Sequence, residues 1–192
     1  MSDATRVLGI ETSTGHLSLG WLEVSAGIVT QSASHSAPVG RAHSELILAQ
    51  LETFMAAQGA TAADVIAVGV GPGSYTGVRV GVSLALGLAR GWHAHAVGVP
   101  SLEAIAGQSE GVVAVTLDAR KGMVYSAAYR VQGGAILETL VMVDKREAAA
   151  FAALVPDDAT WLRDAAPDSV ALARLGLAAR RRGQTSLDIS YL

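Results

Sequence analysis

The chain has 192 residues, of which 51% are hydrophobic and 16% charged, and its 14 Lys and Arg against 17 Asp and Glu give a net charge of -3. This composition predicts an ordered protein with one substantial hydrophobic core or two small ones. The negative net charge argues against a protein that binds nucleic acid by itself, because neutralising phosphates needs a basic surface. The absence of cysteine excludes disulfides and thiol chemistry, and the lack of a leader pattern or of an apolar run of about 20 residues makes the cytoplasm the expected location.

The first half of the chain predicts short strands separated by turns and amphipathic helices. Apolar runs and period-two alternation predict strands at residues 6–11, 17–22, 27–33 and 65–70. A polar loop at 34–42 should lead into a helix at 44–58 capped by Ser44, followed by one short helical turn at 61–64. A long helix is expected from about Thr76 to Arg90.

The second half is richer in strands. We expect strands at residues 94–99, 112–117, 123–131, 135–143 and 160–163. Helices are expected at 101–108, capped by Ser101, and at 145–154 and 168–182. The order predicts an α/β protein, and the join near Pro100 divides it into residues 1–100 and 101–192.

The most informative stretch is the glycine-rich segment from Gly71 to Gly81, between a predicted strand and the long helix. Gly71 and Gly73 can adopt backbone angles closed to other residues, and Ser74 or Thr76 can cap the helix that follows. Such a turn can accept a phosphate or carboxylate, because free amides and the helix dipole point at one spot. It can equally be a turn that merely links a strand to a helix.

Small residues recur every four positions along this helix, at Gly77, Gly81, Ala85 and Ala89. Each glycine inside a helix costs roughly 1 kcal/mol relative to alanine. We therefore expect another backbone to approach closely and offset the cost, either the chain's own sheet or a partner's helix.

A hydroxyl-rich turn follows the first predicted strand. Glu11, Thr12, Ser13 and Thr14 place an acid at the mouth of a hairpin, an arrangement that can meet a phosphate or a metal-bound water. Ser and Thr are also common in turns for structural reasons alone.

Two groups of charged residues lie elsewhere. Asp118 and Arg120 follow a predicted buried strand, where functional loops are common in α/β sheets, and they could equally form a local ion pair. The basic run at 180–182 is either a solvated helix end or a binding patch.

The sequence contains no complete motif for catalysis or for metal binding. His43 and Glu45 begin like a metal site, but Ile47 stands where a second histidine would be needed. Ser74 lies in Gly-x-Ser-x-x-Gly rather than in a nucleophile elbow, and neither a Walker A motif nor a dinucleotide fingerprint is present. We expect no catalytic residue and no metal.

Together these stretches resemble one family, the TsaB (YeaZ) proteins of the bacterial machinery that makes N6-threonylcarbamoyladenosine on transfer RNAs. The matching blocks, in the family's order, are residues 8–14, 41–45, 71–81, 99–102 and 118–125. The block at 71–81 is highly specific, whereas the last third matches weakly, and Ser190-Tyr191-Leu192 looks like the family's closing Tyr-Leu-Arg cut short. Glu11 stands where many TsaB chains have Asp.

The resemblance implies an actin-like (ASKHA, ribonuclease H-like) α/β fold of two lobes, each with a mixed sheet and flanking helices. It implies a non-catalytic scaffold or activator of the paralogue TsaD, acting on tRNAs that read codons beginning with A. The implied partners are TsaD and TsaE, with tRNA bound only through the complex, a homodimer in isolation and no membrane. No cofactor of its own is implied, although ATP or ADP could lie at the complex junction.

The resemblance also assigns residues to roles. The implied docking helices are 44–58 and 76–90, and the implied interface comprises His43, Glu45, Leu48, Leu51, Tyr75, Thr76, Gly77, Arg79, Val80, Gly81, Leu84, Ala85 and Leu88. The implied nucleotide or phosphate loops comprise Glu11, Thr12, Ser13, Thr14, Gly71, Gly73 and Ser74. Asp118 and Arg120 are further family-motif positions.

The alternative is a self-sufficient nucleotide-binding phosphotransferase or M22-like peptidase of the same fold. It predicts ATP binding at residues 12–14 and 71–74, with Glu11 arranging a metal or water. TsaD-like members hold a metal with two histidines four residues apart, and only His43 remains here. This departure favours the non-catalytic partner.

Overall fold

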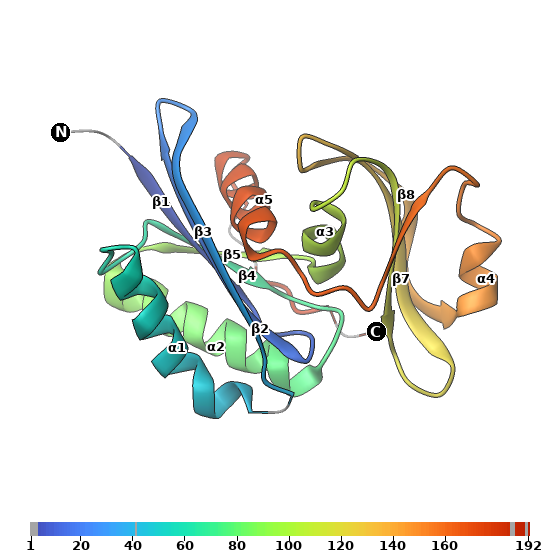
Figure 1. The fold of residues 1–192 in the computed structure, drawn as a ribbon, viewed down its shortest axis with the longest axis horizontal. Helices are drawn as coiled ribbons and strands as arrows, with labels where there is room; N and C mark the ends of the chain where they lie inside the picture. The colour runs from blue at the N-terminus through green and yellow to red at the C-terminus, as the bar shows by residue number, and fades with distance from the viewer. Residues whose placement is uncertain (1–3, 41, 185–186, 191) are drawn as a thin grey trace.

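The computed structural model describes residues 4–40, 42–184, 187–190 and 192 and folds them into two mixed sheets with flanking helices (Figure 1). The first sheet has five strands in the order β3-β2-β1-β4-β5. They are β1 Thr5–Glu11, β2 His16–Ser25, β3 Ile28–Pro38, β4 Val65–Gly69 and β5 His95–Val99. β1, β2 and β3 form an antiparallel meander, and β4 and β5 run parallel to β1.

The second sheet has four strands in the order β8-β7-β6-β9. They are β6 Gly111–Asp118, β7 Met123–Gln132, β8 Ala135–Glu147 and β9 Thr160–Arg163. β7 pairs antiparallel with both β6 and β8, and β9 is parallel to β6. Gly133 and Gly134 close the β7–β8 hairpin with φ angles of 59° and 74°, in the left-handed region that glycine adopts without strain.

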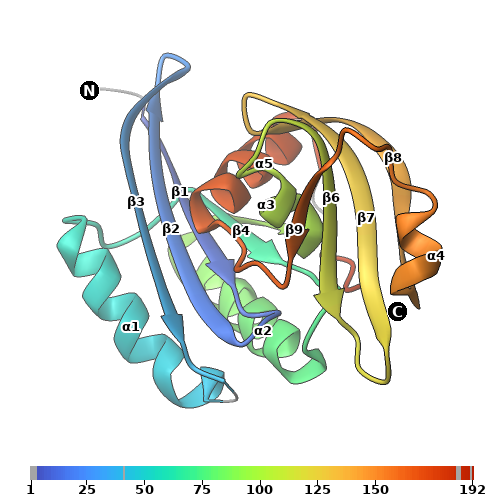
Figure 2. The same cartoon turned by 45° about the vertical axis from the view of Figure 1, so that its right-hand side comes forward.

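The described helices flank both sheets. They are α1 His43–Ala57, α2 Tyr75–Trp92, α3 Ser101–Ala106, α4 Ala148–Ala152 and α5 Ser169–Arg181. α1 and α2 lie on one face, whereas α5 packs on the other (Figures 1 and 2). α3 lies between α5 and the second sheet, and α4 packs on β7 and β8. The outer side of α1 and α2 therefore faces away from the second sheet.

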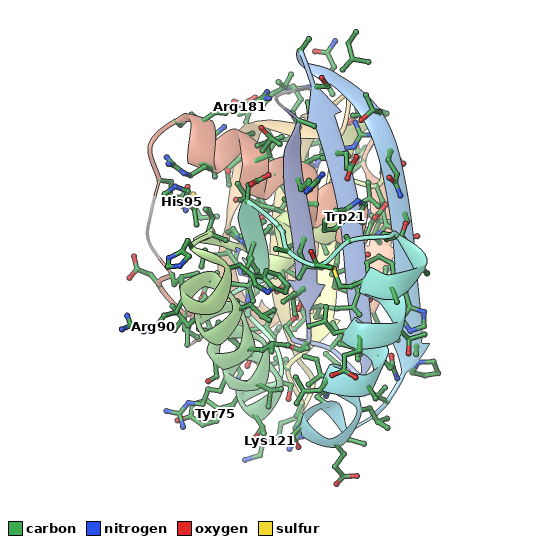
Figure 3. The ribbon with its side chains drawn as sticks, turned by 90° about the vertical axis from the view of Figure 1, so that its left-hand side faces the viewer. Trp21, Tyr75, Arg90, His95, Lys121 and Arg181 are labelled. Atoms are coloured by element: carbon green, nitrogen blue, oxygen red, sulfur yellow. The ribbon has the colours of Figure 1, made fainter. Side chains whose placement is uncertain are left out.

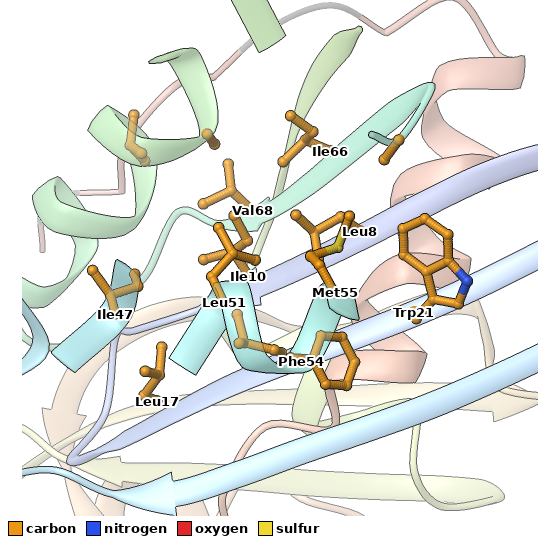
Figure 4. Packing of buried hydrophobic residues seen from close by; sticks show 14 of the residues in the cluster. Leu8, Ile10, Leu17, Trp21, Ile47, Leu51, Phe54, Met55, Ile66 and Val68 are labelled. Atoms are coloured by element: carbon orange, nitrogen blue, oxygen red, sulfur yellow. The ribbon is translucent and has the colours of Figure 1, made fainter. Parts of the chain in front are cut away.

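Two apolar clusters sandwich the first sheet. On the α1 and α2 side, Trp21 and Phe54 pack with aliphatic side chains from β1, β4 and both helices (Figure 4). On the other side, Leu172 and Leu177 of α5 pack against Val7 and residues of β2, β4 and β5. The halves 1–100 and 101–192 thus supply one sheet each, but the last helix of the second half completes the core of the first.

Several expected boundaries are confirmed and others are wrong. β3 runs on to Pro38, because Ser34 and Ser36 continue the pairing with β2 where a loop was expected. β8 likewise continues to Glu147, so only Ala148–Ala152 of the expected helix at 145–154 is helical.

The caps differ from expectation in three places. α1 begins at His43 after Ala42, with no side-chain cap, and Pro100 rather than Ser101 precedes α3. Residues 61–64 form no helical turn, and the Asp64 carboxylate instead accepts the N–H of Arg6 at 2.8 Å. Two family-motif positions, 41 and 191, lie outside the described residues.

Within the described residues, no helix combines the length and apolar character that crossing a membrane requires.

Candidate functional site

Three segments meet beyond the carboxyl ends of the parallel strands in the first sheet: the turn after β1, the turn between β4 and α2, and the start of α3. Backbone hydrogen bonds join them, from the Ser74 N–H to the Ser13 carbonyl at 2.6 Å and from the Ser101 N–H to the Gly71 carbonyl at 2.9 Å. The Gly71 N–H also donates to Ser101 Oγ at 3.2 Å. Ligands of open α/β sheets bind at such an edge. The structure therefore brings the two predicted phosphate loops together.

Glu11 is the buried acid at this meeting point. Its Oε1 accepts the Ser13 N–H at 2.6 Å, whereas Oε2 has no hydrogen-bond partner among the described residues. The carboxylate occupies the space that a side chain on Gly69 of β4 would need. Burial raises the pKa of Glu11 above its ordinary value of 4.5, and the Ser101 and Ser13 groups beside it oppose that rise only in part.

Two side-chain hydrogen bonds hold the first turn of α2, one to the N–H and one to the carbonyl of Gly77. Ser74 is the N-cap, as predicted, and its hydroxyl accepts the Gly77 N–H at 3.2 Å. The Thr12 hydroxyl donates to the Gly77 carbonyl at 2.7 Å, from the turn after β1. The helix start and the β1 turn are therefore fixed to each other.

The glycines of this region allow that close approach. A side chain on Gly73 would overlap the backbone of Ser13, and one on Gly77 would overlap the carbonyl of Thr12. A side chain on Gly81 would meet Thr12 Oγ1. The two glycines of the small-residue stripe, Gly77 and Gly81, are thus explained by close contact with the chain's own turn after β1, so they do not require a partner's helix.

The two predicted phosphate loops contact each other directly and leave no open space between Ser13 and Gly73. The Ser74 amide, which an anion at the start of α2 would approach, already donates to Ser13, and the Ser13 backbone fills the space beside Gly73. A phosphate here would also meet the buried carboxyl group of Glu11. Two surface hollows, of about 360 and 540 Å³, are lined by other residues. Nucleotide binding at these loops stays a prediction.

The outer side of α1 and α2 carries large apolar side chains that face solvent. Leu48 is 57% exposed, Tyr75 54% and Leu86 50%. The Arg79 guanidinium carbon lies 4.2 Å from the centre of the Tyr75 ring. Figure 3 shows α1 and α2 beside each other on this side of the molecule, with Tyr75 at the start of α2. We call the solvent-facing sides of the two helices, which carry Leu46, Leu48, Tyr75, Arg79 and Leu86, the outer helical face; Leu86 lies on its β5 side, in a hollow that it lines with His95 and Leu187.

The residues that the resemblance assigned to the interface separate into two groups. His43, Leu51, Gly77, Gly81 and Ala85 are buried inside the chain's own fold, where they contact other residues of this chain. The others are exposed or half-buried, namely Glu45, Leu48, Tyr75, Thr76, Arg79, Val80, Leu84 and Leu88. For this second group the interface stays a prediction.

His43 serves the fold in this structure. Its Nε2 donates to the carbonyl of His16 at 3.1 Å, which links the start of α1 to β2. Ile47, at the position where a second ligand would be needed, is 3% exposed in the core. Across the described ranges, no group of three or more His, Asp and Glu side chains is placed to hold a metal ion.

Asp118 and Arg120 are linked through the backbone. The Asp118 carboxylate accepts the Arg120 N–H at 2.8 Å, and the Asp118 N–H donates to the Asp164 carboxylate at 2.7 Å. Arg120 and Lys121 have φ angles of 64° and 55°, and both side chains are exposed. The carboxylate therefore shapes a tight turn between β6 and β7, in place of the side-chain ion pair that the sequence left open.

Sequence reasoning missed two features of these surfaces. It did not predict that Leu86 is half exposed although Val82 and Val78, four and eight residues before it, are buried. A spacing of four residues drifts by about 40° per turn from the period of 3.6, and that drift was the available signal. It also read Ser101 as a helix cap, although its hydroxyl accepts from Gly71 in the neighbouring loop.

Comparisons with known proteins now bear on these observations. A family model described as "TsaD: tRNA N6-adenosine threonylcarbamoyltransferase" matches residues 24–160. The tRNA threonylcarbamoyladenosine biosynthesis protein TsaB of Escherichia coli K12 is 35% identical over 133 residues, 65% of this chain and 55% of that protein. TsaB of Bacillus subtilis 168 is 43% identical over 79 residues, 40% of this chain and 34% of that protein. This chain spans about half the length of the curated relatives it matches, or less.

A solved structure shares the fold over almost the whole chain. YeaZ from Pseudomonas aeruginosa superposes with a TM-score of 0.80 at 24% identity, covering 98% of this chain and 100% of that one. The two mixed sheets and their flanking helices are thus the two-lobed, actin-like arrangement that the sequence predicted.

Proposed function

On the premise that this chain belongs to the TsaB (YeaZ) family, within the TsaD-like group whose model it matches, we propose that it is a non-catalytic partner and activator of TsaD. In this role it supports formation of N6-threonylcarbamoyladenosine on tRNAs that read codons beginning with A. The observation that carries the proposal is the outer helical face, where Leu48, Tyr75 and Leu86 are each about half exposed or more.

The position of this face suits docking of another actin-like lobe. The inner sides of α1 and α2 fill the core of the first sheet, so the helices are held rigidly while their outer sides stay open. Aromatic and leucine side chains that cluster on a rigid surface are typical of protein interfaces. Val80, Leu84 and Leu88 of α2 are half-buried and pack partly against the core, so they add some apolar surface to this side of the helix.

The chemistry of the loops supports a role without catalysis. Glu11 is buried with a raised pKa, and the glycine-rich turn is filled by the chain's own β1 turn. In the proposed complex, TsaD supplies the reacting groups, TsaE hydrolyses ATP, and any nucleotide lies at the junction between subunits. Transfer RNA is then held by the assembly, in keeping with the net charge of -3 on this chain.

The experiment measures the affinity of TsaD from the same organism for variants of the outer helical face. Leu48→Asp and Leu86→Asp each place a charge where the partner would bury an apolar side chain, so each should weaken binding by about tenfold or more. In a reconstituted modification assay, activity of these variants should fall at limiting concentration and recover at saturating concentration, because the lost quantity is affinity.

Leu154→Asp provides the matched control, since Leu154 is 56% exposed after α4 in the second lobe. It should bind TsaD like the unmodified chain. Sedimentation of the same three variants without TsaD tests whether a homodimer uses the outer helical face. Unchanged TsaD affinity for both helix variants, with melting temperatures intact, would refute the docking role.

A further inference from the structure

α5 passes between the tips of two hairpins, on the side of the first sheet away from α1 and α2 (Figures 1 and 2). Residues of α5 and of both hairpins line a surface groove. It has a volume of about 360 Å³. The β2–β3 hairpin contributes Leu22, Val24 and Val29, the β7–β8 turn contributes Gly134, and α5 contributes Leu177. We call it the α5 groove. It joins the two lobes, a place where binding sites are frequent.

The floor of the α5 groove is apolar and preformed. Leu22, Val24 and Leu177 are each less than 10% exposed, and they belong to the packed cluster beneath α5. Val29 on the wall is 38% exposed, and its neighbour Ile28 is 70% exposed. Apolar surface therefore continues from the groove onto the hairpin outside it.

The three arginines at the end of α5, residues 180–182, have different surroundings. Arg180 Nη2 donates to His95 Nε2 at 2.9 Å, at the edge of the first sheet. Burial raises the pKa of the Glu103 carboxyl group, and Arg182 lies close enough to oppose that rise in part. Arg181 instead lines the α5 groove together with Arg174. Figure 3 shows Arg181 and His95 at separate heights along this side of the molecule.

Arg174 and Arg181 give the lining of the α5 groove a net positive charge. Both are exposed, and neither forms an ion pair within 4.0 Å with a described residue. The lining itself contains no Asp or Glu, and the Glu110 carboxylate lies at its edge, where it accepts the Gly133 N–H at 3.1 Å. An anionic group is the occupant that this arrangement favours.

The spacing of the two arginines favours a chain segment over a compact ion. Arg174, Ala178 and Arg181 lie on one face of α5, and two helical turns separate the outer pair by about 10.5 Å along the axis. Side chains of an extended chain alternate between its two faces, so those at positions i, i+2 and i+4 point the same way, and positions i and i+4 lie about 13 Å apart. Acidic side chains at i and i+4 can each meet one of the two long, flexible arginine side chains while an apolar side chain at i+2 enters the groove.

We propose that the α5 groove binds an extended acidic segment of a partner protein, with one large apolar side chain in the groove and carboxylates on Arg174 and Arg181. The segment also covers the apolar tip of the β2–β3 hairpin at Ile28 and Val29. This site is separate from the outer helical face, and it stands whether or not that face docks TsaD.

The first test screens the full chain against a random peptide library displayed on phage, with the double variant R174A/R181A as counter-selection. We expect enriched peptides to carry acidic residues four positions apart, with a large aliphatic or aromatic residue midway between them. The absence of enrichment over the double variant, or enrichment of peptides without acids, would overturn the proposal.

The second test measures affinity for the most enriched peptide by fluorescence polarisation. R174A/R181A should bind about tenfold more weakly or worse, and binding to the unmodified chain should weaken as salt is raised. Val29→Asp should also lose affinity, because it removes an apolar contact from the wall. Arg90→Ala, an exposed arginine in the last turn of α2, is the matched control and should bind normally. Equal melting temperatures show that all variants are folded.

Other occupants give different results. Vesicles of phosphatidylcholine with phosphatidylglycerol test a lipid surface, and sedimentation equilibrium tests a second copy of this chain. If R174A/R181A abolishes vesicle binding or dissociates a dimer and leaves peptide affinity unchanged, the assignment to an acidic segment is wrong. If only peptide affinity changes, it holds.

Discussion

The two ends of α2 use glycine for opposite reasons. Near its start, Gly77 and Gly81 face the turn after β1, and a side chain on either would run into Thr12. Near its end, Gly87 and Gly91 are exposed, and an added Cβ would meet nothing within 4 Å. The same residue type is therefore required by packing at one end and is replaceable at the other.

The contrast shows that Gly77 and Gly81 occur where α2 lies closest to another part of its own chain. The close contact fixes α2 against the β1 turn through the Thr12 hydroxyl and the Ser74 cap. The outer helical face is then presented by a helix whose start is held firmly. Four substitutions, taken from the largest expected effect to the smallest, test the contrast.

Gly81→Leu should give the largest effect. Its side chain would enter the space of Thr12 Oγ1 and approach Val68, so we expect a loss of about 3 kcal/mol or more in unfolding free energy, or no folded protein. Urea titration of the purified chain measures it. An unchanged unfolding free energy for this variant would show that Gly81 does not lie in close contact with Thr12 in solution.

Gly77→Ala tests the same end with a single methyl group. Its Cβ would overlap the backbone carbonyl of Thr12, which cannot move aside as a flexible side chain can, and it would disturb the hydrogen bond between the Thr12 hydroxyl and the Gly77 carbonyl. We expect a loss of about 2 kcal/mol despite the better helix propensity of alanine. Thermal melting compared with Gly87→Ala provides the measurement, and a gain in stability would contradict the packing account.

Glu11→Gln tests the buried acid beside the tight end. Burial raises the folded-state pKa of Glu11 above its unfolded value, so its contribution to stability is complete below pH 4.5 and declines as pH rises through the folded pKa. Within that window the unmodified chain should lose about 1.4 kcal/mol per pH unit relative to the variant. Paired urea titrations from pH 4 to 9 measure the difference. Parallel curves at all pH values would show that Glu11 titrates normally.

Gly87→Ala should give the smallest effect and the opposite sign. The position is exposed within α2 and has open space for a Cβ, so alanine should raise the unfolding free energy by about 0.5 to 1 kcal/mol. A modest rise in melting temperature is the expected observation. A fall as large as that of Gly77→Ala would remove the contrast between the two ends.

Much of the architecture could be predicted from local patterns. The buried runs that became β1, β4 and β6, the Ser74 cap and the Gly133-Gly134 hairpin depend on residues near in sequence, so their signals are strong. Strand ends were harder to place, because β3 and β8 continue through polar residues that pair with a neighbouring strand rather than bury side chains.

The candidate site was predicted less well because it depends on long-range contacts. The sequence showed that Gly77 and Gly81 needed a close neighbour, but it could not show that the neighbour was Thr12, 65 residues away from Gly77 in the hydrogen bond they share. For the same reason the buried stripe was assigned to a docking surface. The exposed side chains on which the proposed docking role rests, Leu48, Tyr75 and Leu86, lie on the solvent-facing side of the same helices.

The packing of α5 on the first sheet has a consequence for synthesis. When the ribosome has made β1 to β5, one side of that sheet still lacks its cover, because Leu172 and Leu177 are translated about 70 residues later. Val7, Leu22 and Val97 stay available to chaperones during that interval, and the nascent first lobe acquires its complete core only after most of the second lobe has emerged.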